Sequence, residues 1–188
     1  MLLEQIKNFN WVNEPQNVEF IEKGLLITTK THTDFWQNIT FNISKNDGHF
    51  FSCIKEGDFS LSAKWSFEQP VASAQCGLLV SSDPKNWIKA GILSTTNEQP
   101  QIGVVVSNNG ACDWSIIDLN KDTKTVYFKI KRKIANFIVF YSLDGVEYKQ
   151  IRLINHLYIR QVIDVGAYAC SPKDESFTCI LEDVEIKE

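Results

Sequence analysis

The chain has 188 residues, of which 44% are hydrophobic, and a formal net charge of −4. This length and composition suffice for a full core, and we expect residues 1–188 to form a single domain. The acidic balance argues against nucleic acid or a membrane surface as partner, because both require a basic face.

Taken in chain order, the sequence alternates short apolar segments with turn signals. Residues 59–67 show the clearest strand pattern, since apolar side chains there alternate with serines and a lysine. The Asn109-Gly110 pair favours a hairpin turn. No long stretch has a helical period, so an all-β fold, a sandwich or jelly roll, is predicted. The expected strands are residues 4–9, 18–21, 25–29, 59–67, 75–82, 87–93, 101–107, 114–119, 126–130, 137–142, 146–153, 158–165 and 177–186.

The central hairpin at residues 75–93 has two dissimilar faces. One face is uniformly apolar and fits a core, since side chains alternate along a strand. The other face combines an indole, an amide and an ammonium with glycines, which leave room for a ligand against the backbone. We expect three side chains of this face to be exposed together in a pocket: Gln75, Trp87 and Lys89.

The number and spacing of the cysteines and histidines argue against a metal site and against a set of disulfide bonds. The five cysteines are an odd number without a Cys-x-x-Cys pair, which favours reduced thiols in a cytoplasmic protein. The three histidines lack ligand spacing, so no metal site and no cofactor are predicted. The N-terminal residues lack a secretory pattern, and no apolar run approaches about 18 residues, so we expect no membrane span.

A series of short motifs occurs in a fixed order: Asp34-Phe35-Trp36, Gly48-His49-Phe50, Gly57-Asp58-Phe59, Gln75-x-Gly77-Leu78-Leu79, Asn86-Trp87-Ile88-Lys89, Asp113-Trp114-Ser115, Tyr141-Ser142-x-Asp144-Gly145 and Cys170-Ser171-Pro172. The ordered set resembles the "regulation of enolase" family, small domains of unknown function in the concanavalin A-like lectin/glucanase superfamily. The resemblance runs from about Trp11 to Ile186. It implies a concanavalin A-like jelly-roll sandwich of two curved antiparallel sheets, and it implies no settled activity.

Sugar binding is the function that these residue types favour. A sugar site needs an aromatic plate beside planar amide, carboxylate or ammonium groups, and the polar face of the central hairpin supplies them. Four further residues are predicted to extend the ligand-binding site if their loops fold over it: Asp34, Trp36, Asp113 and Trp114. Packing is the alternative role for the tryptophans, and Tyr168 is interpreted as a lid or as loop packing.

Catalysis finds less support. A glycosidase needs two carboxylates about 5–5.5 Å or 6.5–9.5 Å apart. The Glu-x-Asp-x-x-Glu motif of the laminarinase-type glucanases in this superfamily is absent. Residues 182–185 are interpreted as an exposed edge whose charges discourage pairing with another sheet. Asp144 and Gly145 are assigned to a tight turn, and no catalytic residue is predicted.

These observations leave three functions open. The first is a non-catalytic module that binds a carbohydrate or polyol on a concave sheet. The second is a protein-interaction module that regulates a metabolic enzyme through the same face or an exposed sheet edge. The third is an unrecognised glycoside-active enzyme.

Overall fold

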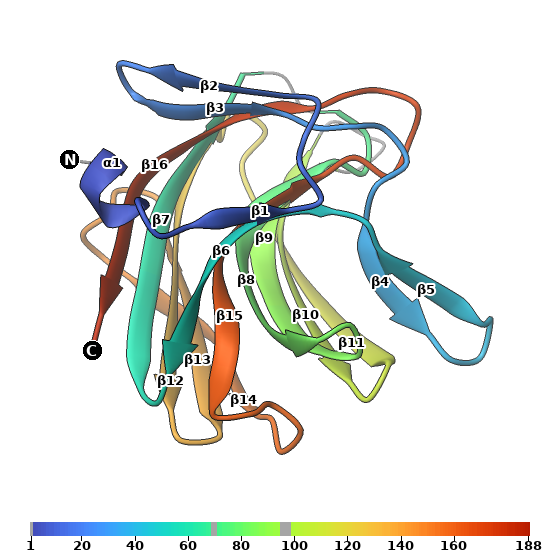
Figure 1. The fold of residues 1–188 in the computed structure, drawn as a ribbon. Helices are drawn as coiled ribbons and strands as arrows, with labels where there is room; N and C mark the ends of the chain where they lie inside the picture. The colour runs from blue at the N-terminus through green and yellow to red at the C-terminus, as the bar shows by residue number, and fades with distance from the viewer. Residues whose placement is uncertain (1, 69–70, 95–98) are drawn as a thin grey trace.

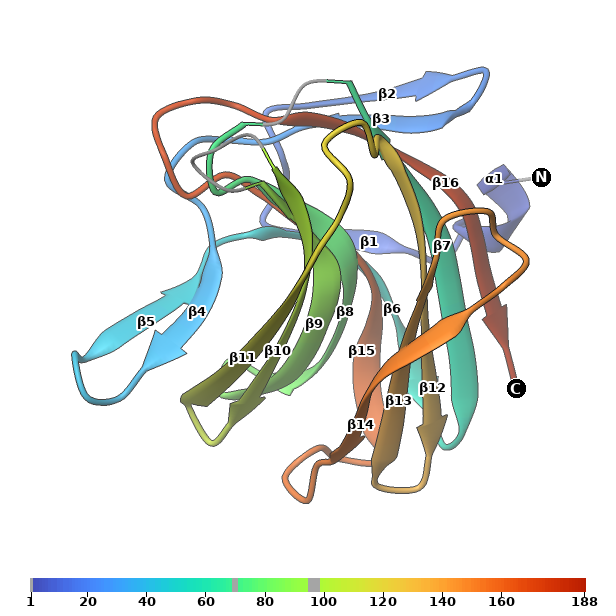
Figure 2. The same cartoon turned by 180° about the vertical axis from the view of Figure 1, so that it is seen from behind.

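The computed structural model describes residues 2–68, 71–94 and 99–188. Two seven-stranded antiparallel sheets face each other across the core, and a short two-stranded hairpin stands beside them (Figures 1 and 2). The predicted all-β jelly-roll sandwich of two curved antiparallel sheets is thus confirmed. Among the described residues, no helix is long and apolar enough to cross a lipid bilayer.

The first sheet is curved and is called the concave sheet below. Its strands lie in the order β1-β6-β15-β8-β9-β10-β11. In that order they are β1 (Asn10–Val12), β6 (His49–Glu56), β15 (Val162–Cys170), β8 (Gln75–Asp83), β9 (Asn86–Ser94), β10 (Pro100–Asn108) and β11 (Ala111–Asp118). The hairpin of β4 (Phe35–Asn38) and β5 (Ile43–Asn46) lies on the hollow side of this sheet, as both views show (Figures 1 and 2).

The second sheet has the order β14-β13-β12-β7-β16-β3-β2. Its strands are β14 (Lys149–Asn155), β13 (Asn136–Ser142), β12 (Thr125–Lys133), β7 (Phe59–Phe67), β16 (Thr178–Lys187), β3 (Gly24–Thr28) and β2 (Asn17–Ile21). Burial alternates without exception along β7, as the sequence predicts. The inward residues of β7 include Trp65, which is fully buried in the core between the sheets.

The apolar face of the central hairpin packs into that core. Leu78 pairs with Ala90 and Val80 pairs with Ile88 across β8 and β9, and all four side chains are completely buried. The prediction for this face is confirmed. The opposite face of the same two strands must therefore point into the hollow of the concave sheet.

The first predicted strand is wrong. Residues 2–5 form the short helix α1 (Leu2–Gln5), and a turn follows in which the Phe9 amide donates to the Ile6 carbonyl at 2.9 Å. Ile6 and Phe9 are both buried in the core. Their spacing of three residues suits a turn, whereas a strand would send them to opposite faces.

Residues 182–185 do not form an exposed edge, because β16 lies between β7 and β3 in the middle of its sheet. Glu182 is buried, accepts a hydrogen bond from Ser66 Oγ at 2.7 Å and pairs with Lys64 Nζ at 2.8 Å. The pairing register shifts between Glu182 and Glu185, which marks a β-bulge. Single-strand periodicity does not reveal which strands lie on either side of a segment.

Asp144 has the structural role predicted for it. Its Oδ1 accepts hydrogen bonds from the Val146 amide at 2.8 Å and the Glu147 amide at 2.9 Å, and Gly145 takes a φ of 77°. These hydrogen bonds to the charged carboxylate lower the pKa of Asp144 to about 2. The turn between β13 and β14 is thereby fixed.

Two buried histidines predict a loss of stability in mild acid. The Lys30 amide donates to His49 Nε2 at 2.9 Å, so the other ring nitrogen carries the proton and donates to the Asn13 carbonyl at 2.7 Å. His156 donates to the Ser107 carbonyl at 2.8 Å. Burial lowers the pKa of both histidines in the folded protein.

Because each folded-state pKa lies below the unfolded value of about 6.5, protonation favours the unfolded chain. The free energy of unfolding should therefore hold its full value above pH 6.5. It should decline below that pH by up to about 1.4 kcal/mol per pH unit for each histidine. Urea unfolding at pH 7.5, 6.5 and 5.5 measures this. The variant His156→Gln keeps a donor for Ser107 and should show a shallower slope, and an unchanged slope would contradict the assignment.

Candidate ligand-binding site

Three glycines lie in one row across the hollow side of the concave sheet. Gly77 pairs with Gly91, and Gly91 pairs with Gly103 on the next strand. Tyr168 pairs with Gly77 at one end of this row, and Ile116 pairs with Gly103 at the other. Gly77, Gly91 and Gly103 are called the glycine row below. Since none of them has a side chain, the row leaves a trough over three adjacent strands.

Two large side chains extend into this trough from its ends. A Cβ atom added to Gly91 would lie 2.7 Å from the Tyr168 hydroxyl, and one added to Gly103 would lie 3.2 Å from Trp114 Nε1. Tyr168 is therefore neither a lid nor loop packing. It belongs to β15, and its ring is buried on the floor of the hollow.

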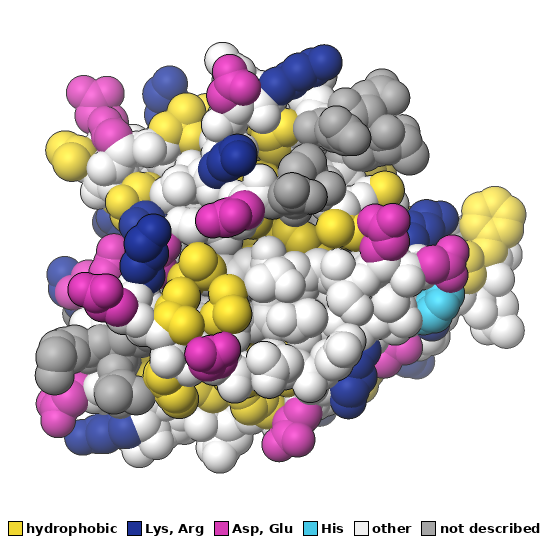
Figure 3. Space-filling model, turned by 90° about the horizontal axis from the view of Figure 1, so that it is seen from above, with side chains coloured by type: hydrophobic (Ala, Val, Ile, Leu, Met, Phe, Trp, Pro, Cys, Tyr) yellow, Lys and Arg dark blue, Asp and Glu magenta, His cyan; other side chains and the backbone are white. Residues whose placement is uncertain are grey.

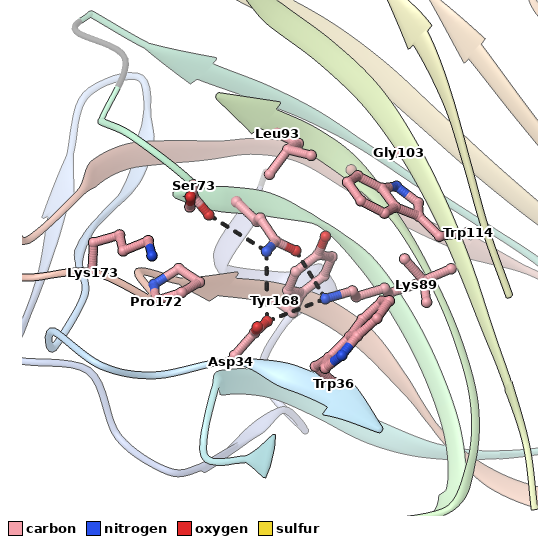
Figure 4. Close-up of a pocket in the computed structure, with 13 residues that line it drawn as sticks. Asp34, Trp36, Ser73, Lys89, Leu93, Gly103, Trp114, Tyr168, Pro172 and Lys173 are labelled. Carbon is pink, nitrogen blue, oxygen red and sulfur yellow. Dashed lines mark hydrogen bonds and ion pairs between the residues drawn. The ribbon is translucent and has the colours of Figure 1, made fainter. Parts of the chain in front are cut away.

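A hollow of about 300 Å³ opens above Gly91 and Gly103 of the glycine row. Five of the predicted site residues line it: Asp34, Trp36, Gln75, Lys89 and Trp114. In the close-up of Figure 4, Trp36 and Trp114 lie on one side of the hollow, and Pro172 and Lys173 lie on the other. The site thus assembles residues that are more than a hundred positions apart in the chain.

Lys89 is buried, contrary to the prediction that it is exposed. Its Nζ donates to the Phe35 carbonyl at 2.7 Å and to Gln75 Oε1 at 2.8 Å, and it lies 3.3 Å from Asp34 Oδ1. An ammonium has three hydrogens to donate, and these three acceptors use them all. Lys89 therefore ties the start of β4 to the concave sheet and is not available to a ligand.

Trp87 lies on the predicted face but is only 1% exposed. Its ring belongs to a second, smaller apolar cluster that includes Phe35, Leu79 and Val105, and its Nε1 donates to the Pro84 carbonyl at 3.2 Å. The prediction of an exposed plate fails because Phe35 of the β4–β5 hairpin folds over this part of the sheet. The alternation of side chains along β9 predicts which face Trp87 takes, but it does not predict that the β4–β5 hairpin covers that face.

Asp113 does not line the hollow. It pairs with Arg152 at 2.9 Å, and its side chain is 69% exposed. Consecutive residues of a strand point to opposite faces, so Asp113 and Trp114 cannot both face the hollow. Including both in one site was wrong for this reason.

The two tryptophans that line the hollow are not core residues. Trp36 and Trp114 meet edge to face, with ring centroids 6.2 Å apart and an interplanar angle of 78°. Trp114 is 49% exposed, and Trp36 is partly exposed. Their contact links the hairpin to the edge strand β11 and leaves indole surface open to a ligand.

Asp34 offers one occupied and one open oxygen. Its Oδ1 accepts from the Phe35 amide at 2.8 Å and also lies near Lys89 and Gln75. No hydrogen bond to Oδ2 is formed by the residues that the structure describes. The Tyr168 hydroxyl is likewise without a hydrogen bond to the described residues, and burial raises its pKa well above the ordinary value, so it stays protonated. An acceptor and a neutral hydroxyl therefore face the hollow.

The described residues can also be compared with the requirements of glycoside hydrolysis, metal binding and nucleic-acid binding. Asp34 is the one carboxylate among the described residues that line the hollow, whereas a glycosidase uses two. Within the described ranges, no three histidine, cysteine or acidic side chains are grouped as metal ligands would be. All five cysteines are free thiols. On the face drawn in Figure 3, the described acidic and basic side chains are mixed, and they form no broad basic patch.

Solved structures show where this fold occurs. A crystal structure described as that of a functionally unknown protein from Saccharomyces cerevisiae matches with a TM-score of 0.89 at 20% identity, over 97% of both chains. The GH43 BlXynB protein from Bacillus licheniformis matches with a TM-score of 0.72 at 15% identity, over 95% of this chain and 36% of that one. The carbohydrate-binding module CBM66 from Bacillus subtilis has a TM-score of 0.59 at 12% identity, over 95% of both chains. At these identities the likeness establishes the fold alone.

Sequence comparison agrees with the structural likeness. "Regulation of enolase protein 1" of Saccharomyces cerevisiae is 24% identical over 170 residues, which cover 90% of this chain and 84% of that protein. Residues 11–188 match the family described as "Protein of unknown function (DUF1349)". The resemblance that the ordered motifs indicated is confirmed, and the chain belongs to the DUF1349 family.

Proposed function

We propose that this protein is a non-catalytic module that binds a neutral carbohydrate or polyol in the hollow above the glycine row. The observation that carries the proposal is the pairing of open indole surface on Trp36 and Trp114 with the free oxygen of Asp34 and the hydroxyl of Tyr168. Aromatic faces suit the apolar C–H side of a sugar ring, and the polar groups suit its hydroxyls.

The charge balance at the floor of the hollow favours a neutral ligand, while Lys173 adds one positive charge on the wall. Lys89 already neutralises Asp34 and has no hydrogen left to donate, so neither an anion nor a cation gains a partner at the floor. A volume of about 300 Å³ is at the small end for ligand pockets, which suits one or two sugar rings. The free thiols favour a reducing compartment, and we propose a cytoplasmic location for this single domain.

Replacing Trp114 should separate binding from folding. Trp114→Ala removes a half-exposed ring at the mouth of the hollow, so we expect sugar affinity to fall at least tenfold, about 1.4 kcal/mol. The melting temperature without ligand should stay close to that of the natural protein. The ligand is first sought in a panel of neutral mono- and disaccharides and sugar alcohols, by the rise in melting temperature that binding causes. Its affinity for each variant is then measured by calorimetry.

Ile117→Ala is the matched control, because Ile117 is a partly exposed apolar residue of β11 on the opposite face from Trp114. It should leave sugar affinity unchanged. The proposal fails if no member of the panel stabilises the natural protein, or if the two variants weaken binding equally.

A second candidate function rests on the name of the yeast relative, "Regulation of enolase protein 1". In that case the same face would bind a protein and regulate a metabolic enzyme. Calorimetry with purified enolase tests this directly. Binding of enolase that Trp114→Ala abolishes, together with no response to any sugar, would favour the protein-interaction module over the carbohydrate module.

A further inference from the structure

A second hollow, of about 200 Å³, lies on the same concave face. Phe35, whose carbonyl is bonded to Lys89, contributes its ring to this hollow, so the docked hairpin separates the two hollows. Apolar side chains that are all nearly completely buried form much of the lining: Phe35, Phe50, Leu79 and Trp87. The interior of this hollow is therefore apolar and largely aromatic.

Acidic groups lie at the border of this surface. Asp164 pairs with Ser81 on β8, and Ser81 pairs with Trp87 on β9, so a carboxylate, a hydroxyl and an indole lie side by side. Asp83 lines the hollow from the end of β8. The polar border of the hollow is thus negative where its interior is aromatic.

The two carboxylates differ in their partners. Asp83 Oδ1 accepts hydrogen bonds from the Lys85 amide at 2.9 Å and from Asn86 Nδ2 at 3.0 Å, and Arg160 Nη2 lies 3.9 Å from its Oδ2. The side chain of Asp164 forms neither an ion pair nor a hydrogen bond with any residue that the structure describes, although its backbone belongs to the ladders with β6 and β8. Burial raises the pKa of Asp164, and no cation among the described residues offsets that effect. Burying a carboxylate without a partner costs free energy of desolvation, and only a ligand or solvent could compensate for that cost at Asp164.

We propose that this second hollow binds a primary ammonium group on an aliphatic stem, such as a lysine side chain or a free diamine. The stem would pack against Phe35 and Trp87, and the ammonium would pair with Asp164 at the rim. Nearby aromatic faces add cation–π attraction. The contrast with the first hollow supports this choice, because Lys89 already neutralises Asp34 whereas Asp164 has no cation.

The probe is Nα-acetyl-L-lysine N-methylamide, which carries one ammonium and no other charge. Its norleucine analogue keeps the aliphatic stem and lacks the ammonium. We expect the lysine probe to cause saturable amide shifts at Ser81 and Asp164 in nitrogen–proton NMR spectra, with at least tenfold weaker binding of the analogue. Titration with 1,5-diaminopentane then distinguishes a free diamine from a peptide-borne side chain as the tighter ligand.

Asp164→Asn should weaken binding of the lysine probe at least tenfold while the melting temperature stays near its natural value. Asp122→Asn removes an exposed carboxylate that lines neither hollow and should change nothing. Equal binding of probe and analogue, equal binding by Asp164→Asn and the natural protein, or no saturable binding of either amine would overturn the proposal. Sugar binding in the first hollow is measured separately with Trp114→Ala, so one proposal can fail without the other.

Discussion

Lys89→Met is expected to lower the free energy of unfolding by about 3 kcal/mol, the lower end of the range for breaking a buried ion pair from one side. Without the ammonium, Gln75 Oε1 and the Phe35 carbonyl lose their shared donor, and Asp34 keeps a charge with 21% side-chain exposure. Methionine fills most of the volume, so lost polar contacts dominate the change. Urea denaturation followed by tryptophan fluorescence measures it.

Lys89→Met should also abolish sugar binding, because the start of β4 carries Asp34 and Trp36 into the hollow. Lys173→Met is the matched control, since Lys173 lines the hollow and forms no ion pair with described residues. That variant should change stability by no more than about 0.5 kcal/mol. Adding Asp34→Asn to Lys89→Met should recover part of the loss. The role assigned to Lys89 is wrong if the two lysine variants are equally stable.

Gly91→Ala is expected to cost about 1–3 kcal/mol or more through overpacking. A Cβ at this position would collide with the Cys76 carbonyl oxygen of the paired strand, and it would lie 2.7 Å from the Tyr168 hydroxyl. The carbonyl belongs to a sheet hydrogen-bonding pattern and cannot move far without disturbing the pairing of β8 and β9. Thermal and urea unfolding should both show the loss.

Gly103→Ala tests the same substitution where the backbone leaves room. Its Cβ would meet only the Trp114 indole, at 3.2 Å from Nε1, and that side chain is half exposed and can shift. Stability should remain within about 1 kcal/mol, because alanine also restricts the unfolded chain. Sugar affinity should fall, since the indole moves into the hollow. Equal destabilisation by the two alanines would contradict the geometry of the glycine row.

Five of the seven predicted site residues line the first hollow, and the errors have physical causes. Gln75 and Lys89 lie on the predicted side of the sheet because alternation along a strand fixes which face a side chain takes. Asp113 was included through its neighbour Trp114, although adjacent strand residues point apart. Tyr168 was missed, yet its place between small residues in an alternating segment is the signal that could have placed it on a strand.

The local features of the chain could be predicted from its residues alone: the alternating strands, the hairpin turns and the apolar face that β8 and β9 bury. These follow from the period of two and from turn residues, which act within a few positions of the chain. Three further features became visible only in the folded chain: β16 lies inside its sheet, the β4–β5 hairpin covers Trp87 and Lys89, and three glycines from three strands form one row. Such features depend on pairing register and on contacts between distant segments, which no single stretch of sequence encodes.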